Sequence, residues 1–126
     1  MAKYERPSML HGTTTKLKGG CGPVYLTANK DDTGKIVEVI IRASKAGVCL
    51  NCQLSCVGRL ISVGLHHGTP LNILSKQLVG TRCQQDSGTP ESPGFIPSCL
   101  SAVGDLLSEI AKEEMVAHQE ASPLDV

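Results

Sequence analysis

Hydrophobic and polar residues alternate along the first third of the chain, which is the pattern of β-strands. Residues 24–28 and 36–43 each place their apolar side chains on one face. The stretch 13–18 is rich in strand-forming residues and is a candidate for a third strand, preceded by an extended lead-in over residues 1–12. Residues 29–35, NKDDTGK, are dense in turn formers. The pattern therefore predicts a small antiparallel sheet of two or three strands.

After Gly47 the apolar positions follow the period of a helix. The apolar side of this helix contains Leu50, Leu54, Val57, Ile61 and Leu65, and is widened by Cys56, Leu60, Val63 and Gly64. The polar side is one narrow stripe made of Asn51, Ser55, Arg59, Ser62 and His66. A helix that is apolar over so much of its surface is expected to be central and to pack against the sheet. We therefore expect Cys56 to be a small core residue.

Two further helices are predicted downstream. Gly68 stops the first helix, and Thr69-Pro70 caps and opens a short helix that ends near Gly80. Residues 81–97 form a loop rich in Gly, Pro and Ser that is longer than the usual connection. Pro97-Ser98 then caps a last helix. The apolar stripe of that helix consists of Leu100, Val103, Leu107 and Ile110.

These elements predict an α+β fold, a small antiparallel sheet followed by three helices in the order β-β-α-α-α, with room for one more strand. The chain of 126 residues has the size of one domain. We divide it into the lead-in 1–12, a four-cysteine domain over 13–112 that contains the loop 81–97, and the end of the last helix and tail over 113–126. Because aromatic residues make up only 2% of the chain, the core must be aliphatic.

Composition narrows the classes of function. Twelve basic and twelve acidic residues cancel, which argues against a general nucleic-acid binder, although residues 1–45 carry an excess of basic groups. Apolar runs are too short for a membrane span, and the polar start has no pattern of a secretory signal. We therefore expect a cytoplasmic protein without a membrane partner. In the reducing cytosol, cysteines are more often metal ligands or redox thiols than disulfides.

Four of the six cysteines are predicted to meet at one end of the sheet. Cys21 lies at the start of one strand, and Cys49 follows the end of its antiparallel partner and opens a helix. The short helix runs back and brings Cys83 toward the same end, where Cys99 begins the last helix. Exposed N–H groups at helix N-termini favour the thiolate form. Four converging thiolates suit tetrahedral zinc or an iron–sulfur cluster.

The residues alone leave alternatives open. A metal or redox site and a set of buried, inert thiols are equally compatible with the spacing. Cys52 lies one turn from Cys56 at the edge of the polar stripe, and it is a spare thiol, a substitute fourth ligand or a redox partner for Cys49. For His66 and His67, we favour complementation of the helix C-terminal dipole over metal binding.

The chain also resembles the TSCPD domain over roughly residues 6–110. The blocks that carry the resemblance are His11-Gly12-Thr13, Cys21-Gly22, Tyr25-Leu26-Thr27, Lys45-Ala46-Gly47 before Cys49, Gly58-Arg59-Leu60-Ile61-Ser62, Lys76-Gln77-Leu78, Arg82-Cys83 and Ser98-Cys99. That domain lies at the C-terminal end of many adenosylcobalamin-dependent (class II) ribonucleotide reductases and also occurs as short free-standing proteins. The resemblance implies that Cys21, Cys49, Cys83 and Cys99 are the family's four cysteines.

Two features depart from the family pattern. The closing motif of the family is Ser-Cys-Pro-Asp, whereas this chain has Ser98-Cys99-Leu100-Ser101 and therefore lacks the carboxylate. The loop over 84–97 is also particular to this chain. A chain of this length has no room for a reductase barrel, so adenosylcobalamin would belong to a catalytic part that is absent here. We therefore expect that the chain is not catalytic alone, despite a reductase family label.

Three functions are consistent with these observations. The first is an accessory four-cysteine zinc domain, linked to deoxyribonucleotide synthesis, that docks on a reductase catalytic chain or on nucleic acid. The second is a thiol–disulfide relay that delivers electrons to a reductase, with Cys49 and Cys52 or Cys83 as the dithiol. The third is a structural interaction module with inert cysteines.

Overall fold

The computed structural model describes residues 4–19, 22–43, 48–82 and 97–121. Three strands, β1 (His11–Gly19), β2 (Gly22–Lys30) and β3 (Ile36–Ala43), precede three helices. The helices are α1 (Val48–His66), α2 (Leu71–Lys76) and α3 (Cys99–Ala121). The predicted α+β class is confirmed, and the candidate third strand forms as β1. This strand is longer than the pattern indicated, because pairing with β2 extends it into the expected lead-in.

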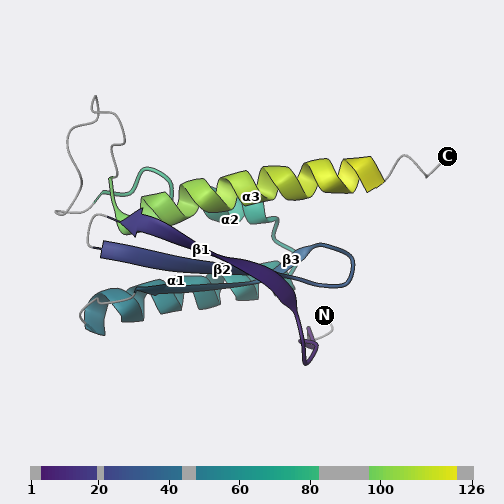
Figure 1. Cartoon of the computed structure of the whole chain (residues 1–126), viewed down its shortest axis with the longest axis horizontal. Coiled ribbons are helices and arrows are strands. Elements are labelled where there is room, and N and C mark those ends of the chain that lie inside the picture. Colours follow the sequence, from purple (N-terminus) through teal and green to yellow (C-terminus); the bar gives the residue numbers. More distant parts are fainter. Residues whose placement is uncertain (1–3, 20–21, 44–47, 83–96, 122–126) are drawn as a thin grey trace.

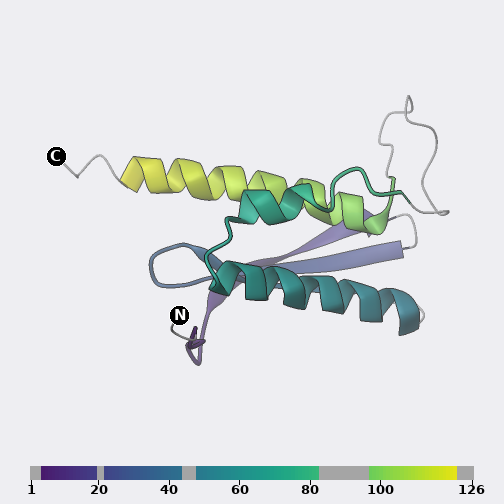
Figure 2. The ribbon, with the colours of Figure 1, turned by 180° about the vertical axis from the view of Figure 1, so that it is seen from behind.

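The three strands form one antiparallel sheet in the order β1-β2-β3, with the helices layered on one face (Figures 1 and 2). Helix α1 packs along β3, α3 lies over β1, and α2 packs against α3. On β2 the side chains of Val24, Leu26 and Ala28 are buried under the helices, which is the alternation that the sequence predicted. The opposite face of the sheet carries no helix among the described residues.

The core is aliphatic, as the composition required. Leu26 and Ile41 stand opposite each other on β2 and β3, and both are completely buried. Leu54 of α1 and Leu107 of α3 close over this pair from the two long helices. Each such side chain contributes about 1.5–3 kcal/mol by leaving water. The core therefore joins the sheet to both long helices through one contiguous cluster.

Two residues of the polar stripe of α1, Asn51 and Ser62, bind backbone groups at the outer edge of β3, where a further strand would otherwise pair. The Val39 N–H donates to Ser62 Oγ at 2.9 Å, and this hydroxyl lies 3.0 Å from the Val39 carbonyl oxygen. The Ala43 N–H donates to Asn51 Oδ1 at 3.1 Å. Gly58 lets the helix approach, because a Cβ there would lie 3.2 Å from the Val39 carbonyl oxygen. Backbone groups that an edge strand leaves unpaired are thus satisfied by the helix.

This arrangement overturns the prediction that Cys56 is a core residue. Cys56 is exposed, and so are Leu60 and Val63, at 66% and 52% of their surface. The buried part of α1 is a narrower strip that includes Leu54 and Ile61. Cys56 follows Leu54 by two residues and Val63 follows Ile61 by two, so each lies on roughly the opposite side of the helix from the buried strip and is left to solvent.

The helix boundaries follow their local signals with one exception. Gly68 and Gly80 adopt positive φ angles of 89° and 86°, as helix-ending glycines do. Ser98 caps α3, since its Oγ accepts the Ser101 N–H at 2.9 Å. The exception is α2: Pro70 precedes its first residue without any side-chain cap. It ends at Lys76, before the predicted end, and residues 77–80 continue as turns.

The N-terminal segment is held against β3 and the end of α1. The Arg6 guanidinium donates to the Glu38 carboxylate at 2.7 Å, and Asn29 Nδ2 donates to the same group at 2.8 Å. The hydrogen bond from Arg6 is the main reason that the pKa of Glu38 lies below its ordinary value of 4.5. The ring of Tyr4 stacks on His66, with centroids 3.9 Å apart. His66 therefore has a packing role that its position at the helix end did not reveal.

We expect Ser62→Ala to lower the free energy of unfolding by about 1–3 kcal/mol, because the β3 edge loses its partner for both backbone groups of Val39. Urea unfolding followed by circular dichroism measures the change. Ser55→Ala is the matched control, since Ser55 lies on the same stripe and its side chain makes no hydrogen bond among the described residues. Equal stability of the two variants would contradict the role of the β3 edge.

The Arg6–Glu38 pair should make the stability of the N-terminal contact depend on pH. Because the folded-state pKa of Glu38 is lowered, its stabilising contribution is complete above pH 4.5 and disappears as the pH falls through the folded-state value. Arg6 is nearly half exposed, so solvent screens the pair and we expect its contribution to stability to be small. The stability difference between wild type and Glu38→Gln should be largest at pH 7 and should shrink steadily as the pH falls below 4.5. A difference that stays constant over this range would contradict the pair.

Candidate functional site

The starts of α1 and α3 lie at the same end of the sheet. At this end β1 stops and β2 begins, since Gly19 pairs with Gly22, and β3 also stops here, since Ala43 pairs with Val24. Figure 1 shows both helices beginning at the left end of the sheet, α3 beside the tip of the β1 arrow and α1 below the strands. Cys49 is the second residue of α1, and Cys99 is the first residue of α3. This is the end at which we expected the four cysteines to converge.

The structure describes two of the four expected site residues, and these two differ in exposure. Cys49 is exposed at the start of α1, whereas Cys99 is buried, with 3% of its surface accessible. Cys21 and Cys83 lie outside the described residues. Within the parts of the chain that the structure describes, no three His, Cys, Asp or Glu side chains gather closely enough to hold a metal ion.

The sulfur of Cys99 lies directly against the end of β1. A Cβ built on Gly19 would stand 2.6 Å from Cys99 Sγ and 2.9 Å from the Gly22 carbonyl oxygen, so no larger residue fits at this position. Gly19 precedes Cys21 by two residues in the sequence. The glycine therefore brings the start of α3 into contact with the strand that leads to Cys21.

Hydrogen bonds also tie the segment before Cys83 to the start of α3. The Gly80 N–H donates to Ser101 Oγ at 3.0 Å, and Thr81 Oγ1 lies 2.9 Å from Ser98 Oγ. Ser101 is 2% exposed and stands where the family motif has its Asp. In this chain the position holds a buried hydroxyl that accepts a backbone N–H, so the missing carboxylate is replaced by a neutral acceptor with a structural task.

The two remaining cysteines, Cys52 and Cys56, form a line with Cys49 on the outer surface of α1. Cys49, Cys52 and Cys56 are all exposed. Their spacing of three and four residues places them on one face of the helix. This line faces away from the core and continues with the exposed side chains of Leu60 and Val63. Sequence reasoning identified all three thiols but assigned Cys56 to the wrong surface.

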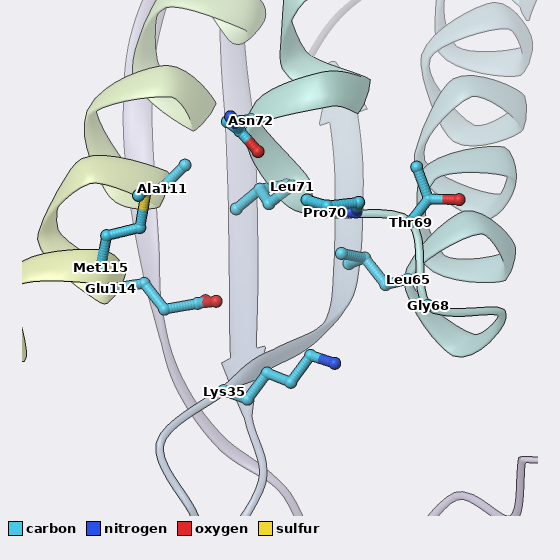
Figure 3. A pocket seen from close by; sticks show the side chains of 10 residues that line it. All are labelled: Lys35, Leu65, Gly68, Thr69, Pro70, Leu71, Asn72, Ala111, Glu114 and Met115. Atoms are coloured by element: carbon cyan, nitrogen blue, oxygen red, sulfur yellow. The ribbon is translucent and has the colours of Figure 1, made fainter. Parts of the chain in front are cut away.

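A cavity of about 380 Å³ lies at the opposite end of the molecule and contains no cysteine (Figure 3). Its wall combines apolar side chains such as Leu65 and Leu71 with Lys35 and Glu114. Glu114 Oε2 accepts the Ile36 N–H at 2.9 Å, so this carboxylate already has a structural partner. Sequence reasoning did not identify the cavity, because its residues come from four separate segments and share no motif.

Comparison with known proteins gives one match. A family model described as the TSCPD domain matches residues 2–111. A search of curated proteins and a search of solved structures each found no match. None of the helices in the described residues is both long enough and apolar enough to cross a membrane.

The close contact between Gly19 and Cys99 predicts that a methyl side chain at position 19 destabilises the fold. Gly19→Ala should lower the free energy of unfolding by about 1–3 kcal/mol, because the added carbon must displace the Cys99 sulfur or the end of the hairpin. Chemical denaturation measures the loss, and Lys18→Ala, an exposed neighbour, is the control. Mass-spectrometric mapping of alkylated Cys99 should show faster labelling in Gly19→Ala. Unchanged stability and labelling would contradict the tight contact.

Proposed function

Because the chain belongs to the TSCPD domain family, we propose that it is an accessory metal-binding domain in which Cys21, Cys49, Cys83 and Cys99 hold one zinc ion. We link the proposed role to deoxyribonucleotide synthesis, and the connection of this family with ribonucleotide reductases supports that link. The partner we propose is a reductase catalytic chain, to which adenosylcobalamin would bind. The chain itself would contribute no catalytic residue.

One observation carries this proposal: two cysteines far apart in the sequence begin two helices at the same end of the sheet. Thiolates are favoured at such positions by the unpaired N–H groups of the first helical turn. The approach of Cys99 to Gly19, and of residues 80–81 to the start of α3, supports the addition of Cys21 and Cys83 to the same group. Four thiolates are the ligand set of closed, structural zinc sites.

The proposed task of the cysteines is to tie together, at one end of the sheet, segments that are far apart in the sequence. When bound, zinc supplies four strong bonds to sulfur and no redox chemistry. Cys99 anchors the group, since it is packed in the core, and Cys49 holds the start of α1 beside the end of β3. Cys21 and Cys83 would attach the β1–β2 connection and the chain after α2. An iron–sulfur cluster on the same thiolates is the alternative metal group.

Elemental analysis of the purified protein tests the proposal. We expect one zinc per chain, no visible absorbance, and loss of the metal in Cys49→Ser and in Cys99→Ser. A strong chelator should lower the melting temperature by about 10 °C or more, as expected when a ligand present at 100 times its Kd, worth about 2.7 kcal/mol, is removed from a domain of this size. Cys56→Ser is the matched control, because this exposed thiol is not among the proposed ligands.

Other results would redirect the proposal. A brown protein that contains iron would replace zinc by an iron–sulfur cluster on the same residues. Metal-free protein with an unchanged melting curve would refute the metal site. In that case, a reversible disulfide between Cys49 and Cys52, both exposed at the start of α1, would favour the thiol–disulfide relay.

A further inference from the structure

Three exposed thiols form a line along α1 that ends in the first turn of the helix. Cys56, Cys52 and Cys49 succeed one another at intervals of four and three residues, which places neighbouring Cβ atoms about 5–6 Å apart on a helix. All three side chains are exposed, whereas the other described cysteine, Cys99, is buried. Cys49 is the end of this line that lies in the first turn of α1, which packs along β3, at the end of the sheet where β3 stops.

The residues of α1 leave these thiols without competing ligands. The helix contains no Asp or Glu. Its last residue, His66, is half-buried beneath the ring of Tyr4 at the far end from Cys49. Apart from that imidazole, thiols are the metal-binding groups that α1 presents, and all of them lie on one exposed strip. A core role for Cys52 or Cys56 is excluded by their exposure.

We propose that Cys52 and Cys56 form an entry dithiol that captures an incoming zinc ion and passes it to Cys49. This inference rests on the proposed function, because Cys49 is also a proposed ligand of the final site. Two thiols one helical turn apart can bind one ion together, and Cys49 lies within one further turn. An ion that is already bound beside Cys49 reaches the final site by exchange between neighbouring thiols. It does not have to meet the final site directly from solution.

The exchange needs no oxidant or reductant. Cys52 and Cys56 each release a proton to solvent when their sulfur binds the ion. Transfer forms the bond to Cys49, whose thiol releases its proton to solvent, as the bonds to Cys52 and Cys56 break, and these two thiolates then take up protons again. Because Cys99 is buried, it receives the ion only after the exposed thiols have done so. The same steps in reverse order would release a resident ion.

Isotope exchange on the folded, zinc-loaded protein tests this route. Protein holding zinc of natural isotopic composition is mixed with excess zinc-67, and native mass spectrometry follows the replacement. We expect the double variant Cys52→Ser/Cys56→Ser to retain one zinc per chain but to exchange about tenfold more slowly, which corresponds to about 1.4 kcal/mol in the barrier. Gln53→Ser, an exposed change on the same turn, should exchange at the wild-type rate.

The possible outcomes separate this inference from the proposed function. Equal exchange rates in wild type and double variant would overturn the entry dithiol and leave the zinc site intact. A double variant that holds less than one zinc per chain would also overturn it, because Cys52 or Cys56 would then be a permanent ligand. Wild-type protein that neither contains nor takes up zinc would refute the proposed function, and the entry dithiol with it. Circular dichroism of the variants confirms that each is folded.

Discussion

The hydrogen bonds between the polar stripe of α1 and the outer edge of β3 orient the rest of the molecule. Ser62 and Asn51 bind backbone groups at two positions along the strand, so α1 is held both in rotation and along its axis. This fixes which side of α1 enters the core and which side reaches solvent. It also fixes the position of Cys49 relative to the end of β3. The exposed thiols and the buried leucines of one helix are thus consequences of a single constraint.

Local signals predicted much of this fold from the sequence. Strand β3 alternates clearly, and Ser98 caps α3 as its position before an apolar stripe indicated. Such features depend on neighbours in the chain. Cys56 was misplaced because it is apolar in type but not in position: it follows Leu54 by two residues, so the two side chains lie on roughly opposite sides of the helix. A polar stripe that satisfies a strand edge has the same sequence pattern as one that faces water.

Features built from distant segments could not be predicted in the same way. Tyr4 and His66 are far apart in the sequence, and the residues next to each of them give no sign that their rings stack. The candidate site is intermediate. Topology was enough to bring Cys49 and Cys99 to one end of the sheet, but the role of Ser101 as an acceptor for Gly80 required the structure. The sequence showed only that a carboxylate was missing.

The close contact of Gly19 with Cys99 has a consequence for damage by oxidants. Oxidation of a thiol to a sulfinic acid adds two oxygen atoms to the sulfur. The site leaves no space for even one carbon atom beside this sulfur on the β1 side. An oxidised Cys99 would therefore force the end of the hairpin away from α3. The exposed thiols of α1 can be oxidised without such a rearrangement, so peroxide would modify them first and reach Cys99 only in molecules whose sheet has already begun to open.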